Sequence, residues 1–226
     1  ARRVKNIRTS LITWYAEHHR DLPWRRTSDP YRVWISEIMA QQTRLETVVP
    51  YYQRFLKRFP NVEKLARARE ESVLKLWEGL GYYSRARNLH KAAGIVTSRF
   101  NGKVPDDPVA FRSLPGVGDY IAAAVMSIAF DQPHAVVDGN VKRVLARLLL
   151  IEAPVNRAAD HKIFKEAAAR LLATARASGL GVHQVPAKLA DLQIAGTAAA
   201  YGLTLATRNT KDFEGLGLDL VDPWQS

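Results

Sequence analysis

The chain has 226 residues, of which 47% are hydrophobic and 24% are charged, and its formal net charge is +11. This composition is ordinary for a chain that folds around a core, and it excludes an intrinsically disordered segment. No apolar run reaches the length of about eighteen residues that a membrane helix needs, so we expect no membrane partner.

The chain contains no cysteine, which excludes a disulfide framework and a Cys-ligated iron–sulfur cluster within these residues. This fits a reducing, cytoplasmic location.

The positive charge is unevenly distributed, because residues 1–150 hold 25 Lys and Arg against 14 Asp and Glu, whereas residues 151–226 hold 8 of each. Such a basic segment favours a polyphosphate partner, and the alternative is a basic surface that is merely solvated.

The first predicted element is an amphipathic helix over residues 1–20, where apolar side chains recur at helical spacing. The segment DLPWRR at 21–26 interrupts it, and the cation of Arg26 is placed to reach a phosphate. A second helix is predicted to begin at Asp29 and Pro30, a capping residue followed by a proline.

Within this second helix Glu37 stands among apolar residues. Partial burial would favour the protonated form of its carboxyl, as a general acid requires, whereas an exposed position would make it an ordinary surface residue. Gln41, Gln42 and Thr43 follow at the predicted helix end. They form either a surface turn or a set of polar groups that probe base edges.

Short helices are predicted over residues 48–87, and a glycine-aromatic turn, GLGYY at 79–83, interrupts them. Tyr82 offers a flat face, and Arg85 and Arg87 offer cations, a mixture that serves stacking and phosphate contacts. The alternative is a helix cap with packed tyrosines. A further helix is predicted over residues 88–99.

The string LPGVG at 114–118 predicts a helix-hairpin-helix, because glycines relieve the steric cost of the tight bend. Backbone N–H groups of Gly116, Val117 and Gly118 lie where a helix begins, and this favours contact with a phosphate. About twenty residues on, Asp138 is predicted to stand at a helix N-terminus, close to Lys142. Isolated LPGVG strings also occur in ordinary turns, but the combination indicates anion binding beside an acidic group.

Several ordered strings make residues 1–172 similar to the helix-hairpin-helix DNA glycosylases, and among them to the MutY-type adenine glycosylases. They are LPWR at 22–25, DPYRVWISEIM at 29–39, QQT at 41–43, GLGYYSRARNLHKAA at 79–93, LPGVG at 114–118 and VDGNVKRVLAR at 137–147. The resemblance implies a mainly α fold and double-stranded DNA with a mispair as the partner.

The resemblance also implies roles for single residues. Glu37 matches the general acid that protonates adenine, and Asp138 matches the carboxylate that stabilises the oxocarbenium-like sugar. Asn140 would orient Asp138, and Gln41 and Gln42 would enter the gap left by the flipped nucleotide. This agrees with the chemistry, which needs one protonated and one ionised carboxyl.

Tyr120 stands where endonuclease III-like relatives carry the Lys that forms a Schiff base. The resemblance therefore implies base excision without strong lyase activity, while thymine-mismatch glycosylases stay a possible subtype. We expect a monomer, acting at the nucleoid. No cofactor is expected for the chemistry, and a structural monovalent cation is allowed at the hairpin.

The tail over residues 173–226 resembles the end of a PIN-domain ribonuclease of the toxin type, with a helix over 188–201 and β runs over 203–207 and 218–221. Asp191 and Asp212 match two of that family's metal-binding carboxylates, but its first strand and further acidic residues have no counterpart here. An incomplete set holds Mg²⁺ poorly, so we expect no ribonuclease activity and no metal.

We therefore predict a glycosylase domain over 1–172, with the hairpin-bearing lobe over 22–135 and the termini in a second lobe, joined to a short α/β-like segment over 173–226. The leading hypothesis is a monofunctional glycosylase that removes adenine opposite guanine or 8-oxoguanine. The alternatives are a thymine-mismatch glycosylase and a chimera that binds DNA but is catalytically weak or inert.

Overall fold

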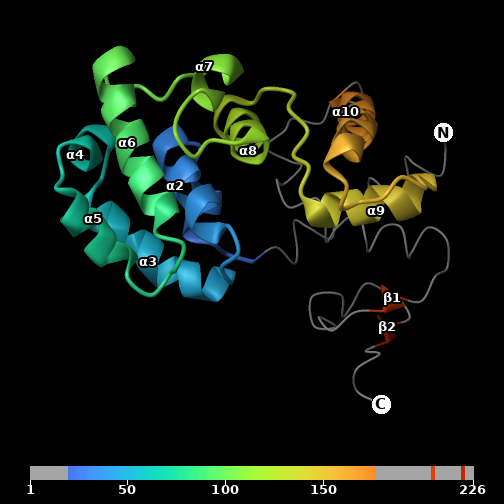
Figure 1. Cartoon of the computed structure of the whole chain (residues 1–226), viewed down its shortest axis with the longest axis horizontal. Helices are drawn as coiled ribbons and strands as arrows, with labels where there is room; N and C mark the ends of the chain where they lie inside the picture. Colours follow the sequence, from blue (N-terminus) through green and yellow to red (C-terminus); the bar gives the residue numbers. More distant parts are fainter. Residues whose placement is uncertain (1–19, 177–204, 207–219, 222–226) are drawn as a thin grey trace. The chain divides into compact units, whose positions relative to one another are not determined.

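The computed structural model describes residues 20–176, 205–206 and 220–221, and this part of the chain is mainly helical (Figure 1). The predicted fold class is confirmed. The predicted helices over 1–20 and 188–201, and the carboxylates Asp191 and Asp212, lie outside the described residues.

The chain divides into two compact units. The central unit is Asp21–His134, and the terminal unit combines Ala1–Arg20 with Ala135–Ser226. The helices of the central unit are η1 (Pro23–Arg26), α2 (Pro30–Ala40), α3 (Leu45–Arg58), α4 (Val62–Ala66), α5 (Glu70–Trp77), α6 (Ser84–Arg99), α7 (Pro108–Arg112) and α8 (Asp119–Phe130). The described elements of the terminal unit are α9 (Gly139–Leu149), η2 (Ala158–Asp160), α10 (His161–Arg176), β1 (Leu205–Ala206) and β2 (Leu220–Val221).

Four helices begin at an Asp or Asn whose side chain accepts a hydrogen bond from a backbone N–H three residues later. Such a cap satisfies one of the amides left without a partner at a helix start. The capping residues and their donor distances are Asp29 of α2 at 2.8 Å, Asn61 of α4 at 3.0 Å, Asp107 of α7 at 2.7 Å and Asp138 of α9 at 2.7 Å. Pro30 and Pro108 then stand in the first turn, where a missing N–H costs nothing.

The core of the central unit lies between α2 and the helices that pack on it, α3 and α8, while α4 and α5 pack on α6 (Figure 1). Aromatic rings meet there edge to face. The ring centroids of Trp34 and Phe111 are 5.3 Å apart, and those of Phe55 and Trp77 are 6.0 Å apart. Such pairs add about 1 kcal/mol each beyond the area they bury. This core fixes α2 against α8, the two helices that carry Glu37 and Tyr120.

The terminal unit has a smaller core, in which Val141 and Leu145 of α9 pack against Phe164 of α10. The strands β1 and β2 pair in parallel, with Leu205 opposite Leu220. Strand structure is therefore confirmed within both predicted β runs, at the residues that the structure describes. The PIN-like character of the tail stays a prediction.

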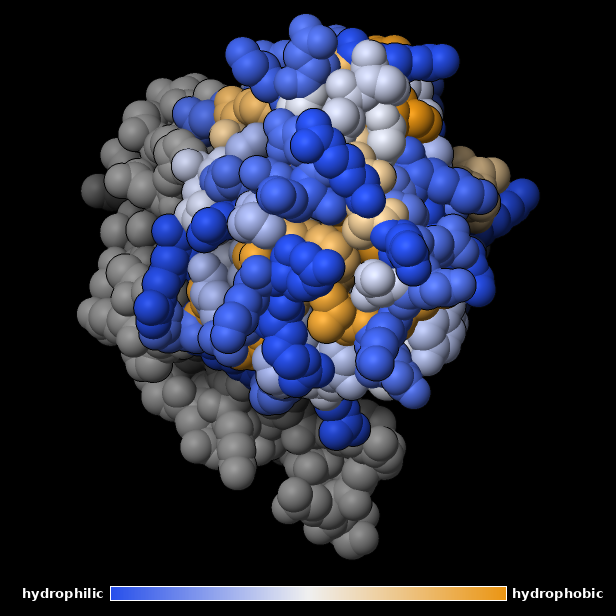
Figure 2. Space-filling view, turned by 90° about the vertical axis from the view of Figure 1, so that its left-hand side faces the viewer, coloured by the Kyte–Doolittle hydropathy of each residue, from blue (hydrophilic) through white to orange (hydrophobic). Residues whose placement is uncertain are grey.

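Two predicted helix boundaries are wrong, since α3 begins at Leu45 and not at the predicted Val48. Helix α6 begins at Ser84, four residues before the predicted start at Asn88. Among the described residues, the face presented in Figure 2 is mostly hydrophilic around a smaller hydrophobic area, as expected for helices that bury only one side. Among the described residues, none of the helices has the length and apolarity that crossing a membrane requires.

Candidate functional site

The carboxylate of Glu37 meets the hydroxyl of Tyr120 inside the central unit. The Tyr120 hydroxyl donates to Oε2 of Glu37 at 3.1 Å, and both side chains are partly buried. Glu37 comes from the last turns of α2, whereas Tyr120 comes from the first turn of α8, directly after the hairpin. This hydrogen bond fixes the orientation of a partly buried carboxyl, and a general acid must be oriented toward the group that receives its proton.

The predicted helix end at Gln41 is confirmed. The backbone N–H of Gln41 caps α2 by donating to the Ile38 carbonyl at 3.4 Å. Gln42 follows with φ at 55°, in the left-handed region that few residues other than glycine adopt, and its side chain is exposed. Thr43 N–H then donates to the Ala40 carbonyl at 3.4 Å. We call residues 41–43 the glutamine turn.

Arg85 of α6 lies against this turn, with its guanidinium partly buried. Its Nη1 donates to carbonyl oxygens at the end of α2, including that of Ile38 at 2.9 Å. Burial lowers the pKa of Arg85, and the negative end of the α2 dipole compensates part of that cost. The sequence predicted a phosphate contact for this residue, but its terminal nitrogens are engaged by the protein.

The hairpin between α7 and α8 depends on glycine at residue 116. Gly116 has φ at 77°, and a Cβ built there would lie 2.8 Å from Cβ of Asn88. Gly118, in contrast, has φ at −89°, and a Cβ at that residue would point into open space, with nothing to meet within 4 Å. An ion pair of 2.7 Å between Arg112 and Asp119 links the two helices across the bend. The predicted hairpin is thus confirmed.

Replacing Gly116 by Ala should lower the free energy of unfolding by about 2 kcal/mol, because it combines a left-handed backbone with a clash against Asn88. The matched control is Gly118→Ala, for which we expect a change within about 0.5 kcal/mol. Urea unfolding followed by tryptophan fluorescence measures both. Equal losses for the two variants would contradict this account of the hairpin.

Asp138, Asn140 and Lys142 belong to the terminal unit. Oδ1 of Asp138 accepts the Val141 N–H at 2.7 Å, so the predicted carboxylate at a helix start is confirmed. Asn140 Oδ1 accepts a hydrogen bond from Nη2 of Arg143, and its role of orienting Asp138 stays a prediction. The ammonium of Lys142 lies 5.9 Å from the ring centroid of Phe164.

The remaining candidates of the central unit are exposed. Tyr82 has 62% of its surface exposed and φ at 47°. Arg26 pairs with Asp21, whose carboxylate raises the pKa of the guanidinium by hydrogen bonding, and Nε of Arg87 lies 3.3 Å from Glu70. Exposed pairs of this kind are weak, so both arginines remain available to an anionic partner.

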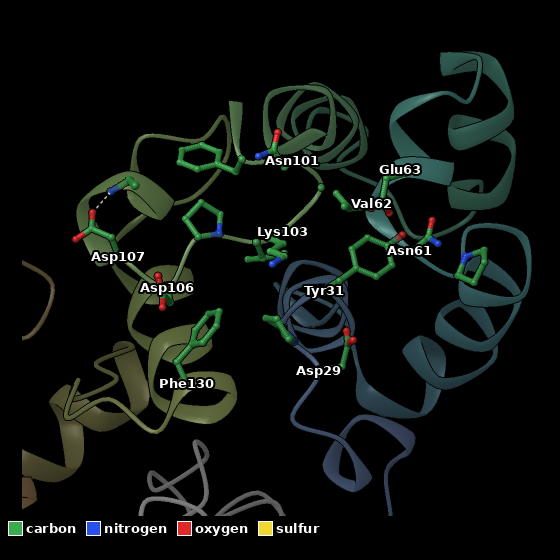
Figure 3. A pocket seen from close by; sticks show the side chains of 17 residues that line it. Asp29, Tyr31, Asn61, Val62, Glu63, Asn101, Lys103, Asp106, Asp107 and Phe130 are labelled. Atoms are coloured by element: carbon green, nitrogen blue, oxygen red, sulfur yellow. Dashed lines mark hydrogen bonds between the residues drawn. The ribbon is translucent and has the colours of Figure 1, made fainter. Parts of the chain in front are cut away.

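A cavity of about 750 Å³ lies at the opposite end of α2 from the glutamine turn (Figure 3). Asp29 and Tyr31 of the α2 start line it, together with Glu63, Lys103 and Asp106 from neighbouring segments. No candidate residue of the predicted site lines it. Within the described part of the chain, no group of three or more His, Cys, Asp or Glu side chains could hold a metal ion.

Sequence reasoning missed three supporting contacts of this region. They are the hydrogen bond between Tyr120 and Glu37, the packing of Asn88 beneath Gly116, and the ion pair between Arg112 and Asp119. Each contact joins residues from different parts of the chain. Only the opposite charges of Arg112 and Asp119, one on each side of the hairpin, could have indicated such a contact from the sequence.

Residues 35–173 match the family model described as HhH-GPD superfamily base excision DNA repair protein. The adenine DNA glycosylase of Buchnera aphidicola (subsp. Baizongia pistaciae) is 47% identical over 141 residues, which cover 61% of this chain and 40% of that protein. The adenine DNA glycosylase of Mus musculus is 43% identical over 171 residues, 71% of this chain and 33% of that protein. The chain thus spans 33% to 40% of the length of these curated relatives.

Two solved structures share the fold. A thermostable thymine-DNA glycosylase matches with a TM-score of 0.70 and 28% identity, over 92% of this chain and 90% of that one. An endonuclease III in a trapped covalent intermediate with DNA matches with a TM-score of 0.58 and 24% identity, over 77% of this chain and 86% of that one.

Proposed function

The chain belongs to the HhH-GPD superfamily of base excision DNA repair proteins, and from this membership we propose that it is a monofunctional DNA N-glycosylase that removes adenine. The observation that carries the proposal is the pairing of Glu37 with Tyr120 beside the hairpin. Curated relatives at 43% and 47% identity, which are adenine DNA glycosylases, support the choice of base.

In the proposed reaction, Glu37 gives its proton to an adenine flipped out of the duplex. The bond between the sugar C1′ and the glycosidic nitrogen then breaks, and its electron pair leaves with the adenine. Asp138 stabilises the positive charge that develops on the sugar. Water adds to C1′ and loses a proton to solvent through Asp138, and an abasic sugar remains.

The partner of this reaction is double-stranded DNA. The glutamine turn would fill the space that the flipped nucleotide leaves, and exposed Tyr82 would stack on a base. Backbone N–H groups of the hairpin would bind a phosphate. Further phosphate contacts are proposed for Arg26, Arg87 and Lys142.

The choice of substrate pair is part of the proposal. We propose adenine opposite guanine or 8-oxoguanine, with little discrimination between the two. A thymine-mismatch glycosylase is the second candidate, since the thymine-DNA glycosylase fold matches over 92% of this chain and Tyr120 fits either subtype. Duplexes with A·8-oxoguanine, A·G, A·T and T·G, treated with protein and then alkali, distinguish the two. Scission of the T·G duplex alone would mean that the excised base is thymine and not adenine. Scission of none of the duplexes would favour a chain that binds DNA but is catalytically inert.

Tyr120 is proposed to hold the Glu37 carboxyl in the orientation needed for proton transfer. Tyr120→Phe removes one hydrogen bond of 3.1 Å and keeps the ring, so we expect a fall of about tenfold in the single-turnover excision rate. Duplex affinity should stay within a factor of about two. An unchanged excision rate would mean that Tyr120 does not orient the Glu37 carboxyl for the reaction.

We propose a monomer that acts at the nucleoid, with the glycosylase domain over 1–172 and the PIN-like segment over 173–226. The hairpin has backbone carbonyl groups, which are the type of ligand that a monovalent cation takes. One of them, the Leu114 carbonyl, also accepts the Val117 N–H at 3.1 Å. One cation held there would stiffen the bend and take no part in the chemistry.

A further inference from the structure

Two surface turns of the central unit meet at the side chain of Arg85. The first is the glutamine turn at 41–43. The second is GLGY at 79–82, which we call the tyrosine turn. Its backbone is left-handed at three places, with φ at 95° for Gly79, 70° for Gly81 and 47° for Tyr82.

On the first side, Nη1 of Arg85 donates to three backbone carbonyls at and just beyond the end of α2. The distances are 2.9 Å to the Ile38 carbonyl, 3.2 Å to that of Met39 and 2.5 Å to that of Gln41. Because α2 stops at Ala40, the carbonyls of Ile38 and Met39 receive no α-helical hydrogen bond from four residues further on, and the Gln41 N–H reaches only that of Ile38, at 3.4 Å. Arg85 therefore caps α2 from another helix and fixes where the glutamine turn begins.

On the second side, Nη2 donates to the carbonyls of Leu80 at 3.1 Å and Gly81 at 3.3 Å, and also to the Thr43 hydroxyl at 3.4 Å. The indole of Trp77 donates to the same Gly81 carbonyl at 3.1 Å. The guanidinium carbon lies 5.5 Å from the ring centroids of both Trp77 and Tyr82. One planar group thus contacts both turns at once.

We propose that Arg85 is a positioning residue that locks the glutamine turn and the tyrosine turn into one rigid unit, so that Gln42 and Tyr82 enter the duplex together. This inference rests on the proposed function. The planar fork suits the role because its two terminal nitrogens point in fixed directions, whereas a lysine carries its three donors on a single nitrogen. Arg85→Lys keeps the positive charge at the end of α2, but its single nitrogen is expected to contact either the glutamine turn or the tyrosine turn and not both.

The test uses Arg85→Lys, Arg85→Met and, as a control, Arg99→Lys in the exposed last turn of the same helix. The full chain is compared in three measurements. They are hydrogen exchange of the free protein, the single-turnover rate of adenine excision from an A·8-oxoguanine duplex at saturating protein, and the salt dependence of binding to that duplex.

We expect exchange to quicken about tenfold in peptides covering 38–48 and 78–86, and to stay unchanged over the hairpin at 108–120. The excision rate should fall about tenfold or more in Arg85→Lys, while duplex affinity and its salt slope stay within a factor of about two. Arg99→Lys should match the unsubstituted chain. Should Arg85→Met fail to fold, Arg85→Lys decides alone.

A phosphate contact by Arg85 predicts the reverse result. Affinity would then fall, the salt slope would drop by about one, and the rate at saturation would be unchanged. That result, or exchange that quickens equally across the whole central unit, would overturn the proposal. If the unsubstituted chain excises no adenine, the proposed function fails by itself, and the exchange measurement still decides whether Arg85 joins the two turns.

Discussion

Glu37→Gln should reduce adenine excision by about 10² to 10⁴-fold, the range that a lost general acid costs. The amide has the size of the carboxyl and can keep a hydrogen bond with Tyr120, which now donates at 3.1 Å, but it has no acidic proton to give. The single-turnover rate on an A·8-oxoguanine duplex measures this directly.

The control for this variant is Glu71→Gln, which makes the same change on the exposed first turn of α5. It should excise adenine at the rate of the unsubstituted chain. Both variants should bind duplex and melt as that chain does. If Glu37→Gln retained more than about a tenth of the rate, the acid would have to be another group.

Asp138→Asn should reduce excision by about 10² to 10³-fold, because the charge that opposes the developing positive sugar is lost. Asparagine is as good a helix cap as aspartate, so α9 keeps its start and the stability should change little. This substitution therefore separates the electrostatic role of Asp138 from its structural role as the N-cap of α9, in which its carboxylate accepts the Val141 N–H.

Asp107→Asn provides the matched control, since Asp107 caps α7 by accepting the Ala110 N–H at the same distance, 2.7 Å. It should leave excision unchanged. A second comparison, Asp138→Ala, should cost about 1 kcal/mol of stability in addition to activity. Equal activity of the Asp138→Asn and unsubstituted chains would mean that Asp138 serves only as a cap.

Much of the helical order was predictable because several helix starts carry explicit signals. Asp29 with Pro30 predicted α2, and Asp138 before Gly139 predicted α9, since both rest on local capping chemistry. The start of α6 was missed for the opposite reason. Its N-cap, Tyr83, makes no side-chain capping bond, so the sequence at 83–88 gives no sign of where the helix begins.

The candidate site was predictable in its residues but not in its contacts. Glu37 and Tyr120 are 83 residues apart, and their hydrogen bond depends on how α2 packs against α8. Arg85 shows the same limit, because a cation beside aromatic residues suggests a phosphate contact. Only the fold brings the carbonyls of Ile38, Met39 and Gln41, at the end of α2, within its reach.

The proposal depends most on the identity of the released product. Mass spectrometry of the small molecules released from an A·8-oxoguanine duplex gives the most direct test. We predict free adenine in an amount equal to the alkali-labile sites, with an intact strand before alkali. No adenine above the level of Glu37→Gln, or strand scission without alkali, would contradict a monofunctional adenine glycosylase.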